Sequence, residues 1–246
     1  MLGVLSFLTV DLEAVVALLP GASMADIPFS PFVMKLVSLI QPSVLVAIAV
    51  GVGVGLAHRV GLHSPAAEAA ANGDPVMAKL KPQILPGIIT GVLVGGALLL
   101  LWAFAKPMMP PEFAARAEAL NRVMPAAFRL LYGGFTEELL LRWGVMTFFV
   151  WLPWRIFRKG EGQPTTPYFV VAILASALLF GIGHLPIVVA LAETVTAATV
   201  LFVIAGNSLF GIAAGFLYWK RGLESAMVAH ITTHLILLTA ISLTSK

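Results

Sequence analysis

The stretch "GGFTEELLLR", residues 133–142, places ionisable side chains in one of the most apolar parts of the chain. The residues Met124-Pro-Ala-Ala-Phe precede it, and Trp143-Gly-Val-Met-Thr-Phe-Phe-Val-Trp-Leu follows it. Its ionisable residues are Glu137, Glu138 and Arg142. Each such group at membrane depth costs about 2.5–3.5 kcal/mol on insertion and usually faces a bundle interior or a water-filled cavity. The stretch therefore predicts a membrane helix whose charges point into a helical bundle.

The composition indicates a multi-pass membrane protein. Of 246 residues, 59% are hydrophobic and 11% are charged, whereas a soluble domain carries about 25% charged residues. The absence of cysteine excludes disulfides, thiolate metal sites and cysteine nucleophiles. The net charge is only +3, and the basic residues lie in short loops. We therefore expect membrane lipid around the chain and no nucleic-acid partner.

Six stretches are long and apolar enough to cross a bilayer, which takes about 20 residues of helix. The predicted spans are 32–56, 84–104, 123–151, 168–185, 195–218 and 223–243. Pro186–Glu193 is interpreted as a loop or a re-entrant piece. Leu2–Leu19 is a further span or an interfacial helix, and Asp11 and Glu13 favour the second. The expected fold is an all-α polytopic transmembrane bundle of about six to eight membrane helices.

The chain divides into three predicted parts. Residues 1–31 form the N-terminal interfacial or membrane helix, and residues 32–122 hold the first membrane helices. Within them, 58–83 is a polar linker, solvated and rich in Ala, Pro and Gly. Residues 123–246 form the catalytic transmembrane core.

Basic residues cluster in alternate loops between the predicted spans. They are Arg59, Lys79 and Lys81, then Arg155, Arg158 and Lys159, then Lys220 and Arg221. The positive-inside rule places these three loops in the cytoplasm. We expect the inner membrane if the chain is bacterial and the endoplasmic reticulum if it is eukaryotic.

The two adjacent glutamates are predicted to differ. Glu138 and Arg142 are spaced i,i+4, so they can pair along one helix face. Glu137 points about 100° away on an α-helix and has no cation beside it. A carboxylate without a partner suits a general base. Taken alone, the Glu–Arg pair could equally serve only to fix helix register.

Three histidines fall in predicted spans. His184 ends the fourth span in "FGIGH", four residues after Phe180. His230 and His234 lie in the last span as "HITTH", on one helix face. Three helices thus bring polar groups into apolar surroundings. Together with the glutamates, they predict a polar catalytic cavity among the C-terminal helices.

The order of these motifs resembles the signature of the CPBP intramembrane proteases, EExxxR, then FxxxH, then Hxxx(N). That family includes the type II CAAX prenyl endopeptidases and bacterial relatives tied to bacteriocin self-immunity or processing. The motifs here read Glu137-Glu138-Leu-Leu-Leu-Arg142, Phe180-Gly-Ile-Gly-His184 and His230-Ile-Thr-Thr-His234. The resemblance covers about residues 125–238.

The resemblance implies a role for each motif residue. Glu137 would be the general base that activates water, and His184 would help to orient or polarise that water. Glu138 and Arg142 would hold the helix and the charge balance.

The remaining motif residues would face the substrate. The resemblance implies that His230 and His234 donate hydrogen bonds to the tetrahedral oxyanion, a contribution typically worth about 3–4 kcal/mol per donor, and that Phe180 packs near the substrate. The family most often has Asn where this chain has His234, and a neutral imidazole can still donate one hydrogen bond. His184, His230 and His234 could also hold zinc. A glutamic mechanism without a cofactor is favoured, because "HITTH" lacks the Glu of HExxH.

The expected activity is therefore that of an intramembrane endopeptidase, and a prenylated C-terminal CAAX peptide is the substrate that the resemblance implies. Two non-enzymatic alternatives stay open. A proton-coupled transporter would be expected to show paired broken helices or repeats, and the sequence shows neither. A bacteriocin-immunity-type partner would bind a peptide in the same cavity without cleaving it.

Overall fold

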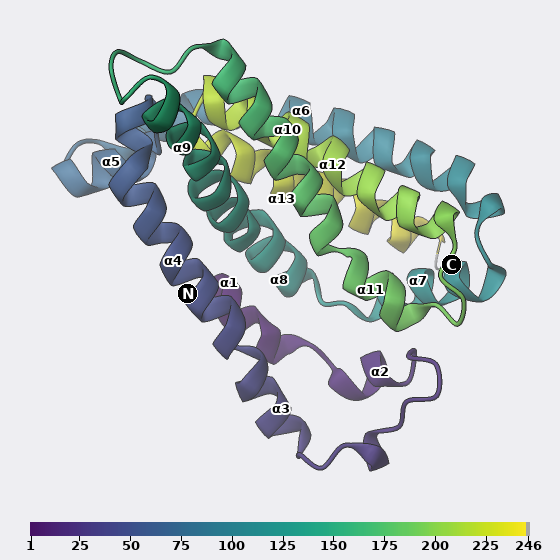
Figure 1. Cartoon of the computed structure of the whole chain (residues 1–246). Helices are drawn as coiled ribbons and strands as arrows, with labels where there is room; N and C mark the ends of the chain where they lie inside the picture. The colour runs from purple at the N-terminus through teal and green to yellow at the C-terminus, as the bar shows by residue number, and fades with distance from the viewer. Residues whose placement is uncertain (245–246) are drawn as a thin grey trace.

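The computed structural model describes residues 1–244, and these form helices without any strand (Figure 1). The all-α polytopic prediction is confirmed. Residues 245 and 246 of the predicted core lie outside the described residues. The long helices are α4 (Ile40–Leu56), α6 (Val76–Ala105), α7 (Pro111–Val123), α9 (Thr147–Phe157), α10 (Thr166–Gly183), α12 (Ala197–Lys220) and α13 (Leu223–Thr244).

Five helical stretches are long and apolar enough to cross a membrane, among residues 1–244. They are Pro31–Val60, Val76–Met108, Thr166–Leu191, Ala197–Lys220 and Leu223–Thr244. The first joins α3 (Pro31–Ser38), α4 and the 3₁₀ turn η3 (Ala57–Val60). The count is lower than the six to eight expected, because the predicted span 123–151 is not among the five.

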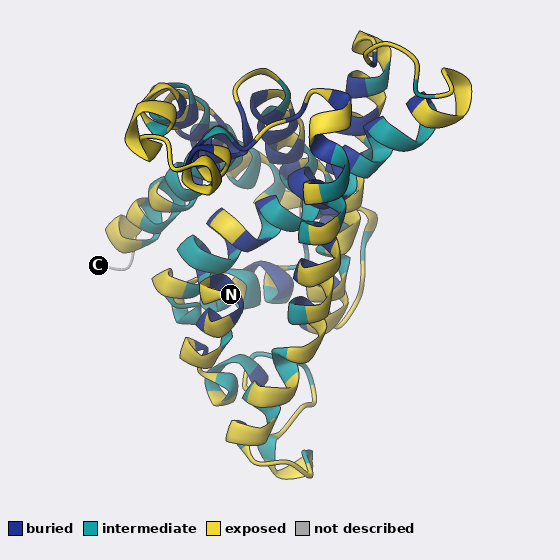
Figure 2. Cartoon of the chain, turned by 90° about the vertical axis from the view of Figure 1, so that its left-hand side faces the viewer, coloured by how far each residue is buried: buried dark blue, intermediate teal, exposed yellow. Residues whose placement is uncertain are grey.

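The outward faces of these helices are apolar. Figure 2 shows exposed residues on the outer sides of the helices and buried ones where the helices meet. On α4, Ile40 and Ile48 are exposed, and on α6 so are Leu85 and Leu93. A soluble monomer rarely exposes such contiguous apolar surface. Lipid is the solvent that these faces require.

Glycines allow the tightest helix pair, α6 with α13. Gly87, Gly91 and Gly95 recur every four residues on the inner face of α6. A side chain at Gly91 would overlap the Ala229 carbonyl and the Thr232 side chain. Small residues let membrane helices approach closely. The backbone approach is direct enough that the Thr233 hydroxyl donates to the Gly91 carbonyl at 3.2 Å.

The same device joins α12 to α10. Gly211 lies against Ala177, and Gly215 lies against Ile173. Both glycines bring the two helices into close contact. A third glycine, Gly206, faces leucines of α6 at ordinary van der Waals distance.

The motif-bearing helix begins after a break at Pro125. Met124 is extended, as the residue before a proline prefers. A continuous helical run then comprises α8 (Ala126–Phe128), the π-helical segments η5 (Arg129–Glu137) and η6 (Leu139–Met146), and α9. The regular α-helix assumed from the sequence is therefore wrong over the motif. π-Helical turns are rare and occur frequently at functional sites.

The N-terminal segment differs from both predictions for it. Leu2–Leu19 forms no long helix; it is divided into α1 (Leu2–Leu5), η1 (Ser6–Thr9) and α2 (Leu12–Val16). Val10 is extended, and Asp11 begins a new helix by accepting a hydrogen bond from the Ala14 amide. The first part packs on η5, with the Phe7 ring edge-on to Tyr132.

Two stretches, one expected to be a solvated linker and the other a loop or a re-entrant piece, are helical. The predicted linker 58–83 contains α5 (Pro65–Asn72) and the first two turns of α6. Within 186–193, α11 (Leu185–Leu191) extends the helical stretch of α10. Val188 and Leu191 are buried in a small core beside α7, which local sequence patterns do not reveal.

The three basic loops lie at one end of the bundle, as the alternation predicted (Figure 1). The amide of Leu223 donates to the His63 carbonyl. The Glu224 Oε1 atom accepts from the Ser64 hydroxyl at 2.7 Å and from the Ala66 amide at 2.8 Å. These bonds tie the start of α13 to α5.

Candidate active site

An ion pair between Glu138 and Arg142 lies at the centre of the motif. The Arg142 Nε atom is 3.3 Å from Glu138 Oε2, and both side chains are fully buried. The guanidinium also lies over the rings of Phe180 and Phe210, at 5.2 and 5.5 Å from their centroids. Desolvated cation–π contacts of this kind contribute about 2 kcal/mol. The predicted i,i+4 pair forms, even though the surrounding helix is π-helical.

His230 lies between this ion pair and Glu137. Its Nδ1 lies 2.8 Å from Glu138 Oε1. Because a carboxylate accepts, Nδ1 carries the proton, and Nε2 points the other way. That Nε2 lies 3.7 Å from Glu137 Oε2. A carboxylate behind a histidine fixes the tautomer and the ring orientation.

His184 reaches the same carboxylate from a different helix. It lies at the C-terminus of α10, where its Nδ1 donates to the Phe180 carbonyl at 2.8 Å. Its Nε2 lies 3.9 Å from Glu137 Oε1. The Phe180 ring stands edge-on to the His184 ring, with the centroids 4.7 Å apart. The FxxxH spacing thus lets one phenylalanine support the imidazole through both its backbone and its ring.

Glu137 has no side-chain hydrogen bond to any residue within 1–244, and its side chain is 17% exposed. Two imidazole Nε2 atoms lie within 4 Å of it, one facing each carboxylate oxygen. A neutral imidazole whose Nδ1 carries the proton offers a lone pair at Nε2. Glu137 is therefore an acceptor facing two further acceptors at distances longer than a hydrogen bond. A small donor such as water fits that arrangement.

His234 lies beside His230 rather than beside Glu137. The two rings are nearly parallel, with centroids 4.9 Å apart. A side chain at Gly133 would come within 2.5 Å of His234 Nε2 and 3.6 Å of His230 Nε2. Glycine at 133 therefore lets the His234 ring pack directly against this helix, with His230 Nε2 close by. Since Gly133 is four residues before Glu137, this contact lies near the Glu137 side of the helix.

The three histidines of the predicted zinc set are not gathered around one point. Among residues 1–244, no group of three or more His, Asp or Glu side chains is arranged to hold a metal ion. The His230 and His234 rings stack, while the Nε2 atoms of His184 and His230 each face a Glu137 oxygen.

The motif residues come together as predicted, but they occupy a packed centre. Two cavities of about 610 and 330 Å³ lie elsewhere, and neither is lined by a motif residue. The site reaches the surface of the bundle at the side chains of Glu137 and His184, which are both partly exposed.

Sequence reasoning missed two participants. The Phe210 ring of α12 lies tilted against the His230 ring, with centroids 4.1 Å apart. The Gly211 carbonyl accepts from Arg142 Nη2 at 3.2 Å. Neither an apolar ring nor a backbone carbonyl is marked as a site residue by sequence pattern. The glycine at 211 was the available signal of close approach.

A family model described as Rce1-like, type II CAAX prenyl endopeptidase Rce1-like, matches residues 119–236. The segment contains all three motifs, and the predicted resemblance is confirmed over it. Neither a curated protein nor a solved structure matches the chain. The match supports a CAAX-type intramembrane endopeptidase in general, acting on a peptide at the membrane. Together with the five apolar helices, it supports an integral membrane protein.

Proposed function

We propose that the protein is a glutamic-type intramembrane endopeptidase that removes the C-terminal tripeptide from a prenylated CAAX substrate. The observation that carries the proposal is the environment of Glu137. It is the one member of the Glu137, Glu138 and Arg142 set that is partly exposed, and no protein donor occupies its oxygens among residues 1–244. The free carboxylate oxygens of Glu137 can therefore accept a proton, as a general base must.

The proposed first step is activation of water between Glu137 and His184. With Nδ1 of His184 protonated, both Nε2 and the carboxylate accept. A water molecule placed between them donates one proton to each and keeps an oxygen lone pair for attack. Glu137 takes a proton as the water oxygen bonds to the scissile carbonyl carbon. General-base catalysis of this kind typically contributes about 10²–10⁴-fold.

The proposed oxyanion donors are the His230 and His234 imidazoles that lie beside Gly133. His234 donates to the developing oxyanion from Nε2. His230 donates from Nε2 after it has taken up a second proton from solvent before the reaction, and Glu138 supports that imidazolium because its carboxylate already holds Nδ1 at 2.8 Å. Collapse of the intermediate breaks the C–N bond, and the proton held by Glu137 passes to the leaving amine. The products are a new carboxylate and the free tripeptide.

Mass spectrometry of a farnesylated CAAX peptide tests this proposal. The purified protein in detergent, wild type and Glu137→Gln, would be incubated with the peptide, with and without a chelator. We expect the wild type to release the tripeptide in the presence of chelator and the variant to release none. Chelator-sensitive cleavage would overturn the glutamic mechanism but keep the protease. A folded wild type that binds the peptide without cleaving it would instead support an immunity-type partner.

A further inference from the structure

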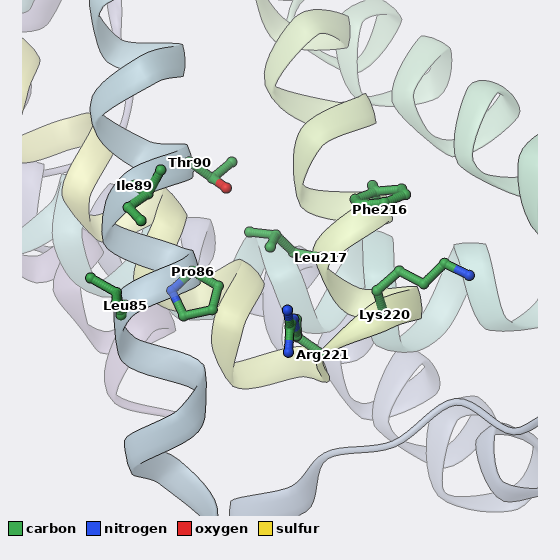
Figure 3. Close-up of a pocket in the computed structure, with 8 residues that line it drawn as sticks. All are labelled: Leu85, Pro86, Ile89, Thr90, Phe216, Leu217, Lys220 and Arg221. Atoms are coloured by element: carbon green, nitrogen blue, oxygen red, sulfur yellow. The ribbon is translucent and has the colours of Figure 1, made fainter.

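A groove on the outer surface of the bundle lies between α6 and α12, away from the motif residues. Its volume is about 610 Å³, within the usual range of ligand sites. Figure 3 shows α6 on one side of it and the last turn of α12 on the other. The residues that matter to the argument are Leu85, Ile89, Phe216, Leu217, Lys220 and Arg221.

The walls of the groove are apolar and belong to membrane-spanning helices. Leu85 and Ile89 are one turn apart on α6 and both are exposed, as is Phe216 on α12. Both helices are candidate spans. This part of the groove therefore faces the hydrocarbon of the bilayer.

One end of the groove is positively charged. Lys220 ends α12 and Arg221 follows it, at the end of the bundle that carries the other basic loops. In Figure 3, Arg221 lies between the two helices on the level of Leu85. Its guanidinium has no ion pair or hydrogen bond within residues 1–244, and no acidic residue lines the groove.

Lys220 is held at the rim by an aromatic ring. Its Nζ lies 3.3 Å from the centroid of the Trp219 ring. Such a contact keeps the ammonium near the surface without neutralising it. The groove thus combines an unpaired guanidinium, an ammonium at its rim and apolar walls running inward from them.

We propose that this groove binds an anionic phospholipid. The phosphate contacts Arg221 and Lys220, and the acyl chains lie along Leu85, Ile89 and Phe216. Basic pockets between membrane helices on the cytoplasmic side are sites for anionic headgroups, and a guanidinium matches phosphate oxygens in pairs. The site is separate from Glu137 and does not rest on the proposed peptidase activity.

Native mass spectrometry of the purified full-length protein tests this site. It would be titrated in a neutral detergent with phosphatidylglycerol, with phosphatidylcholine of the same acyl chains, and with glycerol 3-phosphate. The test variant is Lys220→Gln/Arg221→Gln. The matched control, Arg158→Gln/Lys159→Gln, removes one Arg and one Lys from an exposed loop at the same end. A third variant, Lys220→Arg/Arg221→Lys, keeps both charges.

We expect phosphatidylglycerol to bind more tightly than phosphatidylcholine. The test variant should lose about 30-fold in affinity, which corresponds to about 1 kcal/mol for each of two basic residues. The control and the charge-keeping variant should bind within about threefold of wild type. Equal binding of both lipids, or an equal loss in the control, would overturn the proposal. Binding of glycerol 3-phosphate at the same concentrations would assign the site to free phosphate esters instead.

Discussion

Two glutamates, Glu224 at the junction of α5 and α13 and Glu137 at the centre of the bundle, have opposite surroundings. One Glu224 oxygen accepts from Ser64 and from two backbone amides at the start of α5, at 2.7 to 3.2 Å. Glu137 accepts no side-chain hydrogen bond within residues 1–244, and its carboxylate faces two imidazole nitrogens at 3.7 and 3.9 Å. A carboxylate with one oxygen held by three donors is fixed in place and stabilises the fold. A carboxylate without them costs stability and is free to move a proton.

Glu138 extends the comparison, because it is adjacent to Glu137 and yet resembles Glu224. It is fully buried and sits between Arg142 and His230. In the "EE" pair, Glu138 is therefore the structural acid and Glu137 the reactive one. Glu138 also orients the His230 imidazole that faces Glu137, so the removal of Glu138 should lower both stability and activity.

The largest expected effect is from Arg142→Met. It leaves Glu138 buried with one charge partner fewer, which costs about 3–5 kcal/mol of stability. The measurement is thermal unfolding in detergent. The double variant Glu138→Leu/Arg142→Met removes both charges, so it should regain at least half of that loss. It should still fail to cleave peptide, because His230 has lost its carboxylate. A double variant as unstable as the single one would contradict the pairing.

A smaller effect is expected from Gly133→Ala. Its methyl group would overlap the His234 ring and displace it. We expect cleavage to fall on the order of 10²-fold, as for the loss of one oxyanion donor, and thermal unfolding to shift to a lower temperature, because the His234 ring must move. Gly96→Ala is the control, because nothing lies within 4 Å of the side chain it would add. Equal activity of the two variants would remove Gly133 from the site.

Glu224→Ala tests how much the hydrogen bonds accepted by Glu224 stabilise the fold. It leaves the Ser64 hydroxyl and the Ala66 amide without their acceptor, at a cost of about 1–3 kcal/mol. Thermal unfolding should shift accordingly, while the cleavage rate of the folded protein stays that of wild type. A large loss of activity at temperatures where the variant is folded would show that the α5–α13 junction takes part in catalysis.

The smallest effect is expected from Glu193→Ala. Its carboxylate pairs with Arg116 at the opposite end of the bundle, and its side chain is 57% exposed. Exposed ion pairs contribute about 0–1 kcal/mol. Thermal unfolding should therefore change little. A loss of thermal stability as large as that of Glu224→Ala would contradict the expectation that an exposed ion pair contributes little.

Much of the fold could be predicted from the sequence, because hydrophobic length and charge cost are local properties. The spans 84–104, 168–185 and 223–243 each lie within a helix that could cross the membrane. The Glu138–Arg142 pair followed from spacing alone. The meeting of His184 and His230 at Glu137 was predicted because buried polar groups on separate helices must find one another.

The rest depends on contacts between distant segments. The helical state of 65–72 is supported by Glu224, more than 150 residues away, whose carboxylate accepts from its first amides. The division of 2–19 into short helices depends on packing against η5. Neither the π-helical turns around Glu138 nor the contact of the His234 ring with Gly133 has a local sequence signature. No pattern within a single helix encodes these features.

Replacing each member of the "EE" pair by glutamine tests the central claim most directly. Cleavage of the farnesylated peptide and thermal unfolding would be measured on the same preparations of Glu137→Gln and Glu138→Gln. We predict that Glu137→Gln loses about 10²–10⁴-fold in cleavage at unchanged thermal stability, whereas Glu138→Gln loses stability as well as cleavage. A Glu137→Gln protein that still cleaves within a few-fold of wild type would contradict the assignment of Glu137 as the base.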